Sequence, residues 1–203
     1  MNRKKLTFLL LCVGILGGCG AARPNKYYQL TIPGDSASAA PSPTNGLTLV
    51  IGPFIATHLY KEDQIIYSSG GEEIGTYEYQ RWAEPPAEMI GEVELRLLRS
   101  SGHYKSVYTQ RSDNHGDYLL RGRLYDFKEI SGGSIVARFT AEWELKDLKT
   151  GTPVWTHYYT HDEPVASKDV PAVVAALDRN VQRGVSELQT GLDQFFATLP
   201  PSK

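Results

Sequence analysis

Two histidines have the spacing of a possible metal site. Four residues apart on a helix, His157 and His161 would lie on one face and could bind zinc. The segments around them, Val154-Trp155-Thr156 and Tyr158-Tyr159-Thr160, are β-branched and aromatic and favour a strand. On a strand the two histidines lie about 13 Å apart. We therefore expect no metal here.

Glycine and serine motifs give no stronger indication of catalysis. Gly132-Gly133-Ser134 lacks the second glycine of a nucleophile elbow, and like Gly70-Gly71 it precedes a strand rather than a phosphate-binding helix. His58, His103 and His115 fall in expected loops, and no sequence signature links them to a nucleophile. We predict that the protein is not an enzyme and needs no cofactor.

Cys19 is the residue whose setting predicts covalent chemistry. A basic start is followed by an uncharged, mostly apolar run from Leu6 to Leu16, too short to span a bilayer and typical of a signal peptide. The run ends in Leu16-Gly17-Gly18-Cys19, which resembles the bacterial lipobox. We predict cleavage between Gly18 and Cys19 and attachment of acyl chains, including palmitate, to Cys19. The alternative is an ordinary signal peptide that leaves a free thiol in an oxidising compartment.

Lipidation would anchor the chain to a membrane without spanning it. In the lipoproteins that this motif resembles, Asp after the cysteine marks retention in the inner membrane, so Gly20 favours the outer membrane and a domain facing the periplasm. We divide the chain into a signal peptide (1–18), a lipidated tether (19–26) and one domain (27–203) with a flexible loop at 33–46. The tether reaches about 25 Å if 27–30 is docked, or roughly 90 Å if everything up to Gly46 is loose.

Composition limits the class of partner. The 203 residues include 21 basic and 23 acidic ones. Arg3, Lys4 and Lys5 leave with the predicted signal peptide, so the rest has 18 basic against 23 acidic residues, a net charge near −5. This argues against nucleic acid as a partner. Cys12 and Cys19 are the only cysteines, so the folded part can hold no disulfide.

Strands are predicted from β-branched and alternating segments. We expect a strand at Leu47–Gly52, a hairpin of Gln64–Tyr67 with Ile74–Tyr79, and an antiparallel meander of Tyr118–Tyr125, Ile135–Leu145 and Val154–Thr160. In Ile135–Leu145 every second residue is apolar, which predicts one buried face.

Two amphipathic helices complete the domain. The first runs from Pro86 to Ser101 with Gly102 as its C-cap. The second begins after Ser167 or Asp169 and ends before Pro200-Pro201.

Gly184 and Gly191 lie inside the second helix and should each weaken it by about 1 kcal/mol relative to alanine, so packing must compensate. We predict an α+β fold, a mainly antiparallel sheet with two helices packed on one face, the C-terminal helix long.

Four segments occur in a characteristic order. They are the lipobox with Cys19; Tyr27-Tyr28-Gln29-Leu30; Gly52-Pro53-Phe54 leading to Leu59 and Asp63-Gln64-Ile65-Ile66; and Arg81-Trp82-Ala83-Glu84-Pro85. Together they resemble the ABC-type transport auxiliary lipoprotein family. That family usually has an Asp-Arg pair after the leucine, where this chain has Tyr60-Lys61.

The resemblance implies an outer-membrane lipoprotein that works with a mammalian-cell-entry (MCE) domain protein of an ABC-type transporter, moves lipids between the two membranes and supports membrane integrity. It implies no chemistry. The motif residues expected to be structural are Tyr28, Leu30, Pro53, Leu59, Arg81 and Trp82. Trp82 should anchor the corner before the first helix, and Arg81 should pair with a carboxylate or a carbonyl.

Other functions stay open. One is an outer-membrane assembly or cell-wall-synthase activating lipoprotein, and another is a periplasmic lipid carrier, which needs an apolar cavity of several hundred Å³ between helix and sheet. A homo-oligomeric ring is also compatible with the sequence. Trp155, His157 and Tyr159 share one face of a strand, where they could form an aromatic surface for a partner or fill the helix–sheet interface.

Overall fold

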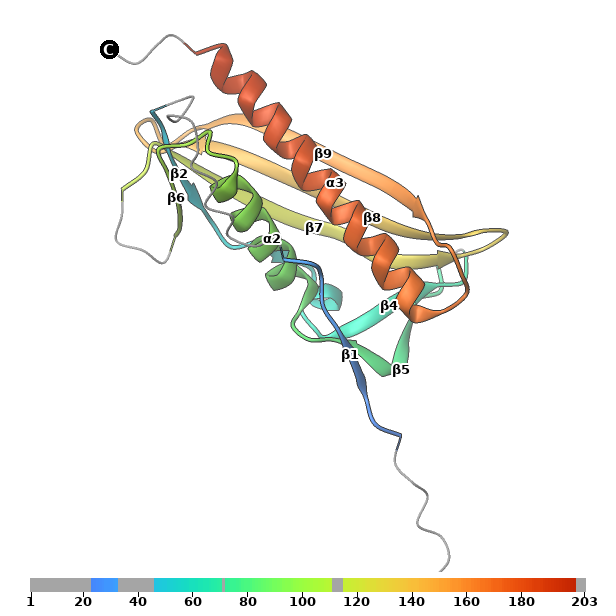
Figure 1. Cartoon of the computed structure of the whole chain (residues 1–203). Helices are drawn as coiled ribbons and strands as arrows, with labels where there is room; N and C mark the ends of the chain where they lie inside the picture. The colour runs from blue at the N-terminus through green and yellow to red at the C-terminus, as the bar shows by residue number, and fades with distance from the viewer. Residues whose placement is uncertain (1–22, 33–45, 71, 111–114, 200–203) are drawn as a thin grey trace, which may run out of the picture.

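The computed structural model describes residues 23–32, 46–70, 72–110 and 115–199. This part of the chain forms two α-helices and a nine-stranded mixed sheet that curls into a half-barrel (Figure 1). The predicted signal peptide, Gly18, Cys19 and residues 33–45 of the predicted loop lie outside the described residues.

The elements follow one another as expected for an α+β domain. The strands are β1 (Lys26–Tyr28), β2 (Thr48–Ile51), β3 (Ile55–Ala56), β4 (Gln64–Ser68), β5 (Gly75–Trp82), β6 (Ser106–Thr109), β7 (Tyr118–Ser131), β8 (Ile135–Asp147) and β9 (Pro153–Pro164). The helices are α2 (Pro86–Ser100) and α3 (Val170–Ala197), with a 3₁₀ turn, η1, at His58–Tyr60.

The sheet is mixed, so the prediction of a mainly antiparallel sheet is wrong. The long strand β7 pairs with β8 in antiparallel fashion along one edge, while β2, β3 and β4 lie one after another along its other edge, each parallel to it. β1 with β5 and β2 with β6 are parallel as well. The antiparallel pairs, β4–β5, β7–β8 and β8–β9, are neighbours in the sequence. Parallel pairs need long crossovers, and local residue patterns do not reveal which distant segments meet.

Both helices pack against one face of the sheet (Figure 1). The side chains that β8 directs toward them are fully buried: Ala137, Phe139, Ala141, Trp143 and Leu145. This confirms the alternation predicted for the strand. Asp169 caps α3 by accepting a hydrogen bond from the Ala172 N–H, and Gly102 follows α2 with a φ of 70°, as a C-terminal glycine should.

Neither of the helices in the described residues has the length and apolar character needed to cross a bilayer.

The first described segment is part of the fold. β1 pairs with β5, and Leu30 behind it is buried in the core. Asp178 and Gln182 of α3 hydrogen-bond to the backbone of Thr31. β1 lies at one end of the molecule, and the C-terminal end of α3 lies at the opposite end (Figure 1).

Candidate functional site

An open groove of about 550 Å³ lies between β9 and the C-terminal half of α3. It is lined by Trp155, Thr156 and His157 of β9 and by Glu187, Thr190, Gly191, Gln194, Phe195 and Thr198 of α3. We call it the aromatic groove. It lies at the end of α3 that is remote from β1 (Figure 1).

The alternation of β9 explains which aromatic side chains reach this groove. Trp155, His157 and Tyr159 all point to the helix side of the sheet, but Tyr159 is buried beneath α3 whereas Trp155 and His157 are half-buried. An aromatic surface for a partner stays a prediction. Tyr159 fills the helix–sheet interface, and the other two form a wall of the groove.

Gly191 lets the helix approach this wall closely. A Cβ placed on Gly191 would lie 2.8 Å from Cζ2 of Trp155, which is closer than van der Waals contact. Phe195, one turn further along α3, stacks at a tilt on the same indole with 6.5 Å between ring centroids. The shape of the groove thus depends on a glycine in α3, Gly191, that faces the large indole of Trp155.

A stack of rings leads from the groove into the buried core. The His157 imidazole lies between two indoles, with centroid distances of 6.0 Å to Trp143 and 5.6 Å to Trp155. The Trp143 Nε1–H donates to Oε2 of Glu94 at 3.3 Å. Burial of Glu94, only 1 % exposed, raises its pKa to about 8, so the carboxyl group is mainly protonated at neutral pH. The aromatic residues that line the groove itself, Trp155, His157 and Phe195, suit apolar or aromatic side chains.

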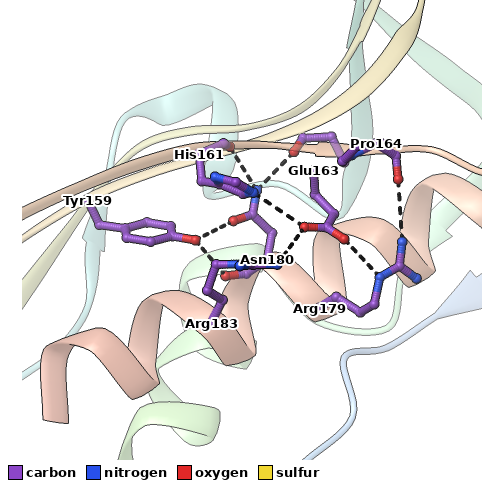
Figure 2. A network of polar contacts seen from close by, with 8 residues as sticks. Tyr159, His161, Glu163, Pro164, Arg179, Asn180 and Arg183 are labelled. Atoms are coloured by element: carbon purple, nitrogen blue, oxygen red, sulfur yellow. Dashed lines mark hydrogen bonds and ion pairs between the residues drawn. The ribbon is translucent and has the colours of Figure 1, made fainter. Parts of the chain in front are cut away.

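A polar network fixes α3 to β9 beyond the groove (Figure 2). Asn180 is fully buried, and its Nδ2 donates to the carbonyl oxygens of Ala137 and His161. Its Oδ1 accepts a 2.7 Å hydrogen bond from the Tyr159 hydroxyl. Every polar group of this amide thus bonds to one of the two strands beneath the helix, which fixes the position of α3 along β9.

Glu163 extends the network to the surface. Its carboxylate accepts hydrogen bonds from Arg179 at 3.1 Å and from Arg183 at 3.3 Å (Figure 2). Burial opposes ionisation, but the two arginines outweigh it and hold the pKa of Glu163 below its usual value.

Four of the predicted motif residues gather at the opposite end of the fold. Tyr28 on β1 is the register partner of Trp82 on β5, whose indole packs on Phe127 with 5.3 Å between centroids. Arg81 donates to Asp63 at 2.8 Å, the carboxylate pairing that was expected. These residues, with the buried Leu30, anchor the corner before α2.

The other two motif residues do not contribute a large buried side chain. Pro53 is exposed and Leu59 is half-buried. Phe54, next to Pro53, packs instead between Gly122 of β7 and Trp143 of β8. The structure therefore does not bring the predicted motif residues to the aromatic groove. The sequence did not predict that α3 forms one wall of the aromatic groove. The residue that could have indicated this is Gly191, because it lies in a helix expected to pack on aromatic strands.

His157 and His161 both lie on β9, as the strand prediction required. No group of three or more potential metal ligands occurs among the described residues.

Comparison with known proteins gives a family and a fold. The family model of the ABC-type transport auxiliary lipoprotein component matches residues 28–188. A search of curated proteins finds no match. The crystal structure of XCC0632 from Xanthomonas campestris, a DUF330 protein, is similar with 20% identity and a TM-score of 0.72, covering 85% of this chain and 100% of that one. A second, uncharacterized protein is similar with 12% identity and a TM-score of 0.67, covering 84% and 99%. At these identities the structures indicate a shared fold.

Proposed function

The chain belongs to the family of ABC-type transport auxiliary lipoprotein components, and from this we propose that it is a non-catalytic accessory component of an MCE/ABC-type lipid transport system. In this proposal Cys19 carries the lipid anchor in the outer membrane, the domain faces the periplasm, and an MCE-domain protein of the transporter docks on it. Its loss would weaken membrane integrity.

The observation that carries the proposal is the short link between the predicted anchor and the folded domain. The Arg23 guanidinium lies over the ring of Tyr79 on β5, 6.0 Å from its centroid, and β1 begins at Lys26. Cys19 precedes Arg23 by four residues, which span about 14 Å when fully extended. A lipid on Cys19 would hold the β1–β5 end of the domain against the membrane.

Such an attachment would direct the aromatic groove away from the anchoring membrane, because β1 and the C-terminal end of α3 lie at opposite ends of the molecule (Figure 1). A domain on so short a tether reaches only a partner that itself crosses the periplasm. The groove is open rather than enclosed, which suits docking of a protein better than carriage of a lipid. Docking around the end of a symmetric transporter would also suit a ring of several copies.

Lipidation is tested by labelling cells with a palmitate analogue. Wild-type protein and Cys12→Ser should take up the label and fractionate with the outer membrane, because Cys12 leaves with the signal peptide. Cys19→Ser should lose the label. Equal labelling of Cys19→Ser would contradict the anchor.

Docking is tested by crosslinking in cells, with a photoreactive amino acid at Thr190 in the groove. The matched control carries the same amino acid at Thr76, an exposed position on β5 at the other end of the domain. We expect an adduct with the MCE-domain protein from Thr190 and not from Thr76. An adduct with a cell-wall synthase instead would support the activator function and reject ours.

A further inference from the structure

One lateral edge of the sheet, formed by β9, is long and has no partner strand among the described residues. β9 has twelve residues and, within the described part of the chain, pairs with β8 alone. β1 and β6 also lie at ends of the sheet, but they are much shorter, with three and four residues. Short edges are a common protection against unwanted pairing, and β9 does not have it.

The register identifies the backbone groups that face this edge. The Val165 N–H donates to the Ile135 carbonyl oxygen, so this pair is hydrogen-bonded, and such pairs alternate along an antiparallel ladder. The N–H and C=O groups of Thr156, Tyr158 and Thr160 therefore point away from β8, to the open edge. The contact between the Thr140 and Thr160 hydroxyls, 2.9 Å apart, agrees with this phase, because side chains lie closest in non-hydrogen-bonded pairs.

Residues 154–160 of this edge favour pairing. They include neither a proline nor an Asp, Glu, Lys or Arg; Pro153 and Pro164 stand at the two ends of β9, and Asp162 is held by Arg138 of β8. Tyr158 is 61 % exposed on the face of the sheet opposite the helices. Thr156 also lines the aromatic groove, so the groove reaches the edge.

We propose that the edge of β9 from Thr156 to Thr160 binds an extended segment of a partner protein as an added strand. The outward main-chain groups of the edge can hydrogen-bond to the main chain of such a segment, and alternate side chains of the segment would enter the aromatic groove or lie beside Tyr158. The matching segment spans about 17 Å, carries no charge, and is apolar at every second position. This deepens the proposed function, on which it rests, by giving the chemical form of the docking segment.

A second copy of β9 fits this edge less well than such a partner. Its groove-side residues would have to enter the groove, but Tyr159 is buried beneath its own α3, and Trp155 already packs against Gly191 and Phe195. A strand from another protein can offer free apolar side chains.

The test uses the full-length purified protein and a capped seven-residue peptide that alternates valine and threonine. Peptide binding should slow amide hydrogen exchange of Thr156, Tyr158 and Thr160 at least tenfold. A peptide N-methylated at every residue lacks all backbone donors and should leave the exchange unchanged. Unchanged exchange with the first peptide, or equal slowing by both, would overturn the proposal.

A pair of variants tests the edge itself. Thr156→Pro removes an outward N–H without removing a bond to β8 and should weaken peptide binding at least tenfold, whereas Thr156→Ala keeps that N–H and should weaken binding much less. Equal binding by both variants would overturn the proposal, and if Thr156→Pro unfolds the protein, the N-methylated peptide on wild-type protein decides. Slowing of the same amides by protein concentration alone, without peptide, would assign the edge to a second copy and also overturn it. Because the peptide test involves no transporter, the strand-binding edge and the MCE partner can fail separately.

Discussion

The ring of Phe54 lies directly against Gly122 of β7: a Cβ placed on Gly122 would come within 2.1 Å of Cε2 of Phe54. The same ring meets Trp143 edge-on with 5.9 Å between centroids. Gly91 of α2 also lies close to Phe54, since an added Cβ would be in ordinary contact, 3.5 Å from the Cβ of Phe54. Phe54 thus joins the Gly52-Pro53-Phe54 motif to the helix, and Gly122 leaves room for its ring.

Gly122→Ala should therefore destabilise the domain, although alanine is tolerated in strands better than glycine. Overpacking of a filled core costs about 1–3 kcal/mol. Urea unfolding should show a lower midpoint with an unchanged slope. Phe54→Leu in the Gly122→Ala background should recover part of the loss, and strictly additive effects of the two changes would contradict the contact.

The two glycines of α3 should respond differently to alanine. A Cβ on Gly184 would lie 2.9 Å from Phe139 and 3.0 Å from Tyr159, both buried, whereas a Cβ on Gly191 meets the half-buried Trp155. Alanine gains about 1 kcal/mol of helix propensity at either site. We expect Gly184→Ala to lower the free energy of unfolding by about 1–3 kcal/mol through overpacking. Gly191→Ala should be nearly neutral because the indole can shift toward solvent.

The same helix serves as its own control, since the substitution is identical and only the facing side chain differs. Thermal unfolding of the two variants in one buffer gives the comparison. Equal stabilisation of both would show that neither glycine is there for close packing.

The sequence predicted the parts of the fold that depend on neighbouring residues. Apolar residues at helical spacing gave α2 and α3, and strict alternation gave the buried face of β8. Gly184 and Gly191 correctly indicated that packing must compensate for their low helix propensity in α3. The aromatic residues that face these glycines could not be predicted. Parallel pairing of β7 with β2, β3 and β4 was missed because it joins segments separated by tens of residues.

The sequence predicted only the β9 side of the aromatic groove. Trp155 and His157 followed from the alternation of β9, but their helix partners depend on how α3 crosses the sheet, which no local pattern specifies. The same limit applies to Phe54, whose importance arises from Gly122, far away in the sequence.

Asn180→Ala should cost about 2–4 kcal/mol, because it leaves the buried Tyr159 hydroxyl without its closest acceptor and removes the donor shared by two strand carbonyls. Chemical unfolding measures the loss. Gln182→Ala on the same helix, which removes a hydrogen bond to the exposed Thr31, should cost much less. If Tyr159→Phe costs as much in the Asn180→Ala background as in wild type, the two side chains do not act together.

Glu94→Gln should stabilise the domain increasingly as the pH rises. The pKa of Glu94 is raised from 4.5 to about 8 by burial, so between these values the folded state keeps a proton that the unfolded state has released. Stability from this group is complete below about pH 4.5, falls by about 1.4 kcal/mol per pH unit at most, and is fully lost above about pH 8. Glutamine keeps an oxygen acceptor for the Trp143 indole but cannot ionise.

The measurement is the difference in free energy of unfolding between Glu94→Gln and wild type at pH 4, 6, 7 and 9. It should be smallest at pH 4 and largest at pH 9, because only wild type must bury a carboxylate at this position at high pH. Glu88→Gln, an exposed change on the same helix, should show no such growth. A difference for Glu94→Gln that stays constant with pH would mean that burial does not raise the pKa of this carboxyl group, and that Glu94 is ionised at neutral pH in the folded protein.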